Sequence, residues 1–195
     1  MTSPDEAGGS PPATLTPTGW EPPVPEGAPT PATPRLPAGL HATLQGHLVP
    51  GATPAYVHQD VLTEIARHGR NALGRAGGLL LGSRHGVGPE GWIEVDGFAA
   101  AGPVESNTLL AARLQAALLD ESTIDPEKVV GWFYCRPAPG PRPTPQELRL
   151  HRTLFPEQDW PLLLLVETRR ARLTLFQLRD ATAQGTGFFL LNEAR

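Results

Sequence analysis

The sequence predicts one α/β domain, in which helices flank a mixed β-sheet, preceded by a disordered proline-rich tail. From residue 57 onward, segments with apolar residues at helical spacing alternate with short aliphatic runs typical of buried strands. Proline is distributed unevenly, since 11 of the 23 prolines lie in the first 37 residues. The length of 195 residues is sufficient for a single hydrophobic core.

The proline-rich segment over residues 1–37 consists mainly of Pro, Thr, Ala, Gly and Glu, with almost no aliphatic periodicity. Such a composition cannot bury enough apolar surface to offset the entropy lost on ordering. We therefore expect residues 1–50 to form a disordered tail and linker, and residues 51–195 to form the domain. Trp20 is the one aromatic residue of the tail, and it is either solvated or a short docking element.

Three helices are expected. Residues 57–71 and 108–121 carry apolar side chains at helical spacing. Thr144 and Glu147 have the spacing of a capping box, with Pro145 at the first helical position, so a third helix is expected over residues 144–155.

Six strands are expected between and after these helices. The first two are joined by a turn-rich segment over residues 84–91, which predicts a hairpin with a long loop. The expected strands span residues 77–83, 92–98, 128–134, 160–167, 172–178 and 187–191.

Composition excludes several classes of protein. The net charge is −4 with a pI near 5.8, and no basic face with interleaved aromatics is present, so nucleic acid is not an expected partner. The longest apolar run, residues 162–166, is far shorter than the roughly 20 residues of a membrane span. The N-terminus lacks the basic and apolar regions of a secretory signal, and Cys135 is the single cysteine, so a cytoplasmic location is expected. The preference for Arg, Ala, Gly and Pro is typical of a GC-rich bacterial genome.

One strand and the loop after it carry the main functional clue. The strand begins Val129-Val130-Gly131-Trp132, and Thr144-Pro145-Gln146-Glu147 follows after a proline-rich loop. This order resembles the JAB/MPN (JAMM) family of deubiquitinase-like metalloproteases, in which a Val-Val-Gly-Trp strand leads into His-x-His-Pro and then Ser-x-x-Asp. The Gly-Gly-Leu-Leu-Leu-Gly segment at residues 77–82 is similar to another strand of that family. The resemblance implies an MPN-like mixed sheet with a cytidine-deaminase-like architecture.

In the register of that resemblance, the residues that would hold and activate zinc are replaced. The two ligand histidines fall on Tyr134 and Arg136, and the ligand aspartate falls on Glu147. The serine falls on Thr144, and the glutamate that serves the family as general base falls on Arg75.

Zinc catalysis needs three protein ligands and an open position for water. A phenol that titrates near ~10 is a poor ligand, and a guanidinium has no lone pair to give. Arg75, Arg136 and Glu147 already sum to about one positive charge without a metal. We therefore expect no cofactor, and we expect one or both arginines to pair with Glu147 and fill the vacated pocket.

Simpler interpretations stand beside this one. A capping box alone explains Thr144 and Glu147. Cys135 beside Arg136, with His151 nearby in sequence, would suit a repurposed thiol nucleophile, although a lone cysteine at a strand end is usually a packed hydrophobe. No pair of the other histidines has the spacing of a helical metal site.

Three functions follow from the resemblance. The favoured one is a catalytically inactive pseudoenzyme domain that acts as a protein-interaction or scaffold module, with an unidentified protein partner and with homo- or hetero-dimer formation through the domain. The second is a zinc-dependent isopeptidase or related hydrolase. In the third, Arg75 and Arg136 bind a carboxylate such as a protein C-terminus in the cleft beside Glu147.

Overall fold

The computed structural model describes residues 40–193, except residues 74, 87–89, 121, 123, 138–141, 157, 159, 171 and 180–181. The expected disorder of the tail falls on residues 1–39, outside the described part. Within the described residues, no helix is long and apolar enough to span a membrane.

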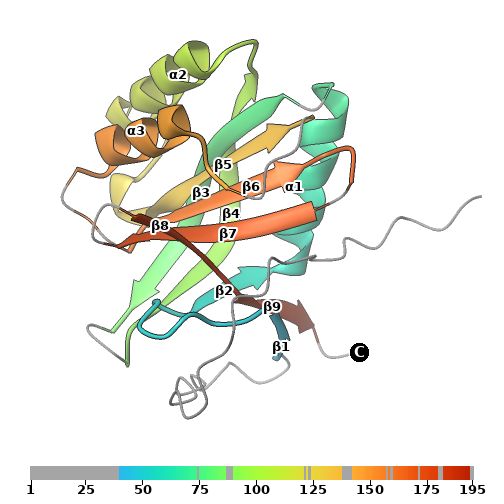
Figure 1. Ribbon diagram of the computed structural model, residues 1–195, viewed down its shortest axis with the longest axis vertical. Helices are drawn as coiled ribbons and strands as arrows, with labels where there is room; N and C mark the ends of the chain where they lie inside the picture. The colour runs from blue at the N-terminus through green and yellow to red at the C-terminus, as the bar shows by residue number, and fades with distance from the viewer. Residues whose placement is uncertain are drawn as a thin grey trace, which may run out of the picture.

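Within the described residues, nine strands form one mixed sheet that is the body of the fold (Figure 1). Its spatial order is β1-β9-β2-β4-β3-β5-β6-β7-β8. The pairs β2–β4, β2–β9 and β5–β6 are parallel, and the other pairs are antiparallel. The strands are β1 (Leu40–Gln45), β2 (Ala55–His58), β3 (Ala76–His85), β4 (Trp92–Pro103), β5 (Val129–Arg136), β6 (Leu162–Glu167), β7 (Arg172–Arg179), β8 (Thr182–Thr186) and β9 (Phe188–Glu193).

The sheet is strongly curled. Only Gly187 separates β8 from β9, yet β8 is at one end of the strand order and β9 is next to the other end. The chain can connect them directly only because the sheet bends back on itself. Gly187 also donates a backbone hydrogen bond to the His47 carbonyl, which ties this crossing to the turn after β1.

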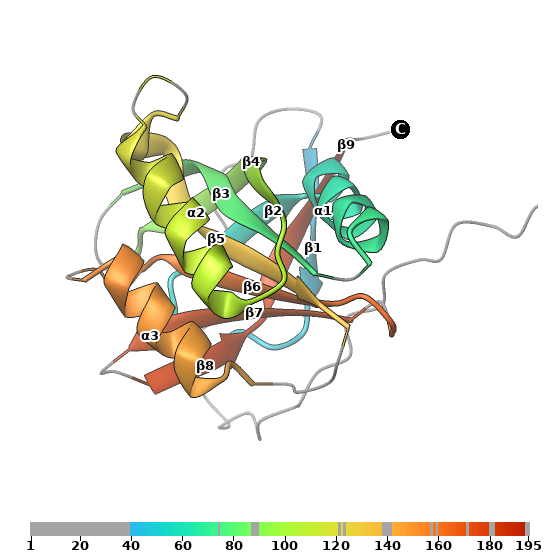
Figure 2. The same ribbon diagram turned by 90° about the horizontal axis from the view of Figure 1, so that it is seen from above.

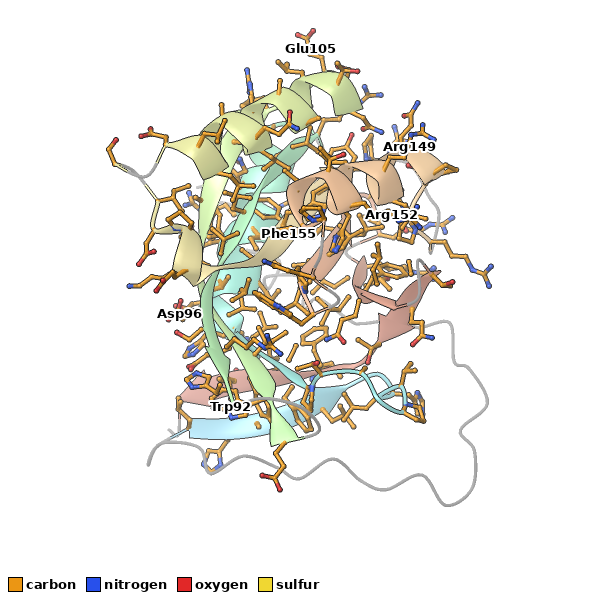
Figure 3. The ribbon with its side chains drawn as sticks, turned by 90° about the vertical axis from the view of Figure 1, so that its left-hand side faces the viewer. Trp92, Asp96, Glu105, Arg149, Arg152 and Phe155 are labelled. Carbon is orange, nitrogen blue, oxygen red and sulfur yellow. The ribbon has the colours of Figure 1, made fainter. Side chains whose placement is uncertain are left out.

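Helices cover both faces of the sheet (Figure 2). Helix α1 (Gln59–Asn71) lies on one face, and α2 (Asn107–Leu119) and α3 (Pro145–Leu154) lie side by side on the other. A 3-10 turn, η2 (Pro126–Lys128), precedes β5. In α3, Arg149 and Arg152 are exposed and point away from the sheet, whereas Phe155, which follows the helix, is buried (Figure 3).

The two sheet faces bury separate cores, because side chains alternate along each strand. One core joins Val61, Leu62 and Ile65 of α1 to residues such as Phe133. The other joins α2 and α3 to β5 and β6 through a larger set: Leu110, Leu114, Leu150, Leu154, Trp132, Tyr134, Leu163 and Leu165.

The α/β class, with helices flanking a mixed sheet, is confirmed. All three expected helices and all six expected strands are present within a few residues. The expected helix start at residue 57 was wrong, because residues 55–58 form β2 and α1 begins at Gln59. Strands β1, β2 and β8 were not expected, and β1 lies inside the 1–50 segment assigned to tail and linker.

Candidate functional site

The candidate site lies where β5 ends and α3 begins. Tyr134 belongs to the core beneath α2 and α3, whereas Cys135 belongs to the core beneath α1. Because residues two apart on a strand share a face, Arg136 points to the same side as Tyr134. This alternation brings Arg136 next to Glu147, which lies in the first turn of α3.

Arg136 and Glu147 form a nearly buried ion pair. The Arg136 Nη1 atom donates to Glu147 Oε1 at 2.9 Å and to Oε2 at 3.0 Å. Arg136 Nη2 donates to the Arg142 carbonyl at 3.0 Å. The side chains are 12% and 2% exposed, respectively, so the carboxylate is almost fully removed from water and neutralised by the arginine.

The same carboxylate caps α3. The Thr144 backbone N–H donates to Glu147 Oε2 at 2.6 Å, and the Glu147 N–H donates to Thr144 Oγ1 at 3.2 Å. This is the reciprocal arrangement of a capping box. The cap and the ion pair are therefore not competing interpretations, since Glu147 performs both roles.

Tyr134 lies at the position of the first ligand histidine in the expected register. Its side chain is 7% exposed. Burial raises the pKa of the Tyr134 phenol, an effect that Arg75 partly opposes and Glu147 reinforces. The phenol is consequently neutral near pH 7 and offers no phenolate to a metal.

Arg75 has a different role from the expected one. It is exposed, and its Nη1 atom donates to the Glu105 carbonyl at 3.0 Å. Glu105 lies just before α2 (Figure 3), so this bond ties the start of β3 to the segment leading into that helix. Of the two arginines, Arg136 pairs with Glu147 as expected, and Arg75 bonds the backbone elsewhere.

These residues do not fit a zinc ion. The donor set consists of a neutral phenol, a guanidinium and a carboxylate whose oxygens accept three hydrogen bonds from Arg136 and Thr144. Across the described segments, no group of three or more His, Cys, Asp or Glu side chains is arranged to hold a metal ion.

Cys135 and His151 do not form a nucleophile and base. Cys135 is fully buried in the core beneath α1, its Sγ atom lies 3.7 Å from the Ile65 carbonyl oxygen, and burial raises the pKa of its thiol to about 12. His151 lies on the opposite face of the sheet, where its Nδ1 atom accepts a hydrogen bond from Trp132 Nε1 at 3.0 Å. Burial lowers the pKa of His151 to about 4.

A polar cluster on strands β2, β3 and β4 was not anticipated from the sequence. His58 Nε2 lies 2.9 Å from Glu94 Oε1, and His85 Nε2 lies 3.3 Å from Glu94 Oε2. The His85 ring stacks on Trp92 with centroids 3.8 Å apart. His58 is distant in sequence from the other members and lies on the unexpected strand β2, so spacing alone gave no signal for this cluster.

Comparison with protein-family models gives no match, and comparison with curated proteins gives none either. Among solved structures, the chain is similar to the solution structure of protein DSY2949 from Desulfitobacterium hafniense. The two share 18% sequence identity with a TM-score of 0.52, over 72% of this chain and 95% of that one. At this identity, the similarity concerns the fold alone.

Proposed function

We propose that the chain is a catalytically inactive JAB/MPN-like domain that acts as a protein-interaction or scaffold module. The observation that carries the proposal is the Arg136–Glu147 pair. In the register of the resemblance, it joins the positions of the second ligand histidine and the ligand aspartate. In that register, the positively charged guanidinium of Arg136 therefore occupies the place where the family would bind the zinc ion.

The pair supports a structural role for these positions. Arg136 connects the end of β5 to the first turn of α3, and through the Arg142 carbonyl it also holds the far end of the intervening loop. Removing water from charges is costly unless they are paired, and here the pairing is nearly complete. In place of carrying chemistry, Arg136 and Glu147 stabilise the junction of β5, the loop and α3.

The outer side of α2 suits a partner protein. Leu110 and Leu114 are its buried residues, but Ala112, Ala116 and Leu119 are exposed, and Leu119 is 83% exposed. A helix that is apolar around most of its circumference normally has a partner on each side. We propose this surface for homo- or hetero-dimer formation, and a cytoplasmic location, which the single buried Cys135 fits.

The two alternative functions need side chains that already form hydrogen bonds within the protein. A zinc hydrolase needs three free ligands. A carboxylate clamp needs two arginines, but Arg136 already donates to Glu147 and the Arg142 carbonyl, which leaves the clamp to Arg75. The arrangement favours the interaction module over both.

The proposal is tested by measuring zinc by mass spectrometry on native protein after mild zinc exposure and desalting. We expect no stoichiometric zinc. One zinc per chain that disappears in Glu147→Ala would contradict the inactive assignment and would return the hydrolase as the leading interpretation.

A further inference from the structure

A cavity of about 410 Å³ lies between β7, β8 and the turn after β1, and its lining includes Arg142, whose carbonyl accepts from Arg136. Its walls include the apolar side chains of Leu173, Leu175, Phe176 and Phe188, and its polar lining includes His47 and Gln184. This volume is within the ~300–1,000 Å³ range of pockets that bind ligands.

Two features of β8 leave hydrogen-bonding groups at this cavity without partners among the described residues. Strand β8 is the last in the sheet order and pairs only with β7 among the described strands. An end strand presents unpaired backbone groups on its outer side. In addition, Gln184 Oε1 is buried and has no hydrogen-bond partner within the described residues. A ligand that fits would be apolar and would bring a hydrogen-bond donor.

The chain itself has a segment with this chemistry. Trp20 combines a large apolar ring with a single N–H donor, and Glu21 and the pair Pro22-Pro23 follow it directly. Proline-rich segments are recognised by aromatic-lined grooves. Residues 1–39 contain four carboxylates and one arginine, whereas the described lining of the cavity contains Arg142 and no carboxylate, so the charges are complementary.

The segment is also within reach. Strand β1 starts at Leu40, which pairs with Glu193, and ends at Gln45, which lines the cavity. Five residue steps of about 3.3 Å separate the two ends, or roughly 17 Å. The 19 residues between Trp20 and Leu40 span up to roughly 60 Å at about 3.1 Å each.

We propose that the cavity is an intramolecular docking site for the N-terminal segment, with the Trp20 indole on the apolar floor and its N–H donated to Gln184. Tethering strengthens the contact, because a short linker supplies an effective concentration of the order of 1 mM. An intrinsic dissociation constant of about 0.1 mM then gives roughly ten docked molecules for each undocked one. The docked segment covers the outer edge of β8.

The test uses the full chain labelled with ¹⁵N-tryptophan, in which the four indole N–H signals report separately. Loss of one signal in Trp20→Phe assigns it to Trp20. We expect this signal to lie away from the position of free tryptophan, to exchange slowly with water, and to remain unchanged on dilution.

Gly185→Leu is designed to fill the cavity. A Cβ added at Gly185 meets Phe176 Cε1 at 3.4 Å, so the backbone accepts the substitution and the side chain lies over the cavity floor. The matched control is Gly97→Leu on β4, outside the cavity, where the nearest atom is Leu81 Cβ at 3.7 Å. We expect Gly185→Leu to return the Trp20 signal to the free position and Gly97→Leu to leave it docked.

Gln184→Leu provides a second variant that keeps the side-chain size and removes the acceptor, and we expect faster exchange of the Trp20 N–H. The other three indole signals show whether each variant is folded. A Trp20 signal at the free position in the wild-type chain overturns the proposal. So does a shifted signal that Gly185→Leu leaves unchanged, or one that dilution abolishes, because the last result means docking into a second copy.

Discussion

Glu147 illustrates how one side chain can serve two structural purposes. Its carboxylate accepts from Arg136 and from the Thr144 backbone, while the side chain is 2% exposed. A buried carboxylate without partners would be strongly destabilising, so its cost is offset only while both partners remain.

The first prediction concerns this coupling. We expect Arg136→Ala and Glu147→Ala each to lower the free energy of unfolding by about 2–4 kcal/mol, because each leaves a largely buried charge unpaired. The double variant should lose at least about 1 kcal/mol less than the sum of the two. Urea unfolding of the four proteins measures the coupling, and Thr144→Ala, which removes only the cap, should cost about 1 kcal/mol. Additive losses in the double variant would show that the two charges do not interact.

The second prediction concerns Cys135. Its burial and its raised pKa of about 12 keep it a neutral thiol near pH 8. We expect a colourimetric disulfide reagent to label the native protein only at the rate of opening or unfolding, and to label one thiol immediately in denaturant. Rapid stoichiometric labelling in native buffer would refute the buried position.

The third prediction concerns the pH dependence of stability. Burial lowers the pKa of His151 from 6.5 to about 4, so between these pH values the unfolded chain binds the proton and the folded chain does not. Stability from this residue is complete above about pH 6.5 and is lost as the pH falls toward 4, by about 3 kcal/mol in total. The difference between the urea midpoints at pH 7 and pH 4.5 should therefore be smaller in His151→Gln than in the wild-type protein. An equal pH dependence in the two proteins would exclude His151 as the cause.

At the scale of elements, Gly131 explains why a glycine interrupts the apolar strand β5. A Cβ added there would lie 2.2 Å from the Leu162 carbonyl oxygen on β6, closer than atoms can approach. The strand pairing also shifts register here, opposite Leu80 and Leu81. The glycine thus allows the close approach of β5 and β6 that positions Tyr134 and Arg136.

The fourth prediction follows from that contact. We expect Gly131→Ala to destabilise the protein by several kcal/mol, because backbone on both strands must move. Gly185→Ala, whose added Cβ meets its nearest neighbour at 3.4 Å, should cost less than about 1 kcal/mol. Chemical denaturation of the two variants provides the comparison, and similar losses in both would contradict the steric explanation.

The elements that the sequence predicted are those with a strong local pattern. The cap at Thr144 and the apolar run of β6 identify their elements without tertiary information. Strand β2 was missed because α1 follows it without a turn, so the apolar stripe of the helix extends into the strand. Strand β8 has the sequence TAQGT, which has no apolar alternation, and only its pairing with β7 defines it.

At the scale of the whole molecule, the curled sheet determines which distant residues meet. The Arg136–Glu147 pair was predicted from the register of the JAB/MPN resemblance, which placed both residues, together with Arg75, at one site. The contact of Glu94 with His58 depends on the parallel pairing of β4 with β2, a strand that was not expected, and the cavity between β7, β8 and the turn after β1 depends on the curl of the sheet. No local pattern specifies that pairing or that curl, so both features were missed from the sequence.

The most direct test of the account introduces the JAB/MPN residues at the three proposed ligand positions and at the proposed general-base position. The variant combines Arg75→Glu, Tyr134→His, Arg136→His and Glu147→Asp, and calorimetric titration with zinc compares it with the wild-type chain, with circular dichroism confirming that both are folded. We expect one zinc per chain in this variant and none in the wild type, because in the proposed register the ion pair occupies the positions of the metal ligands. Stoichiometric zinc in the wild type, or a folded variant that binds none, would contradict the account.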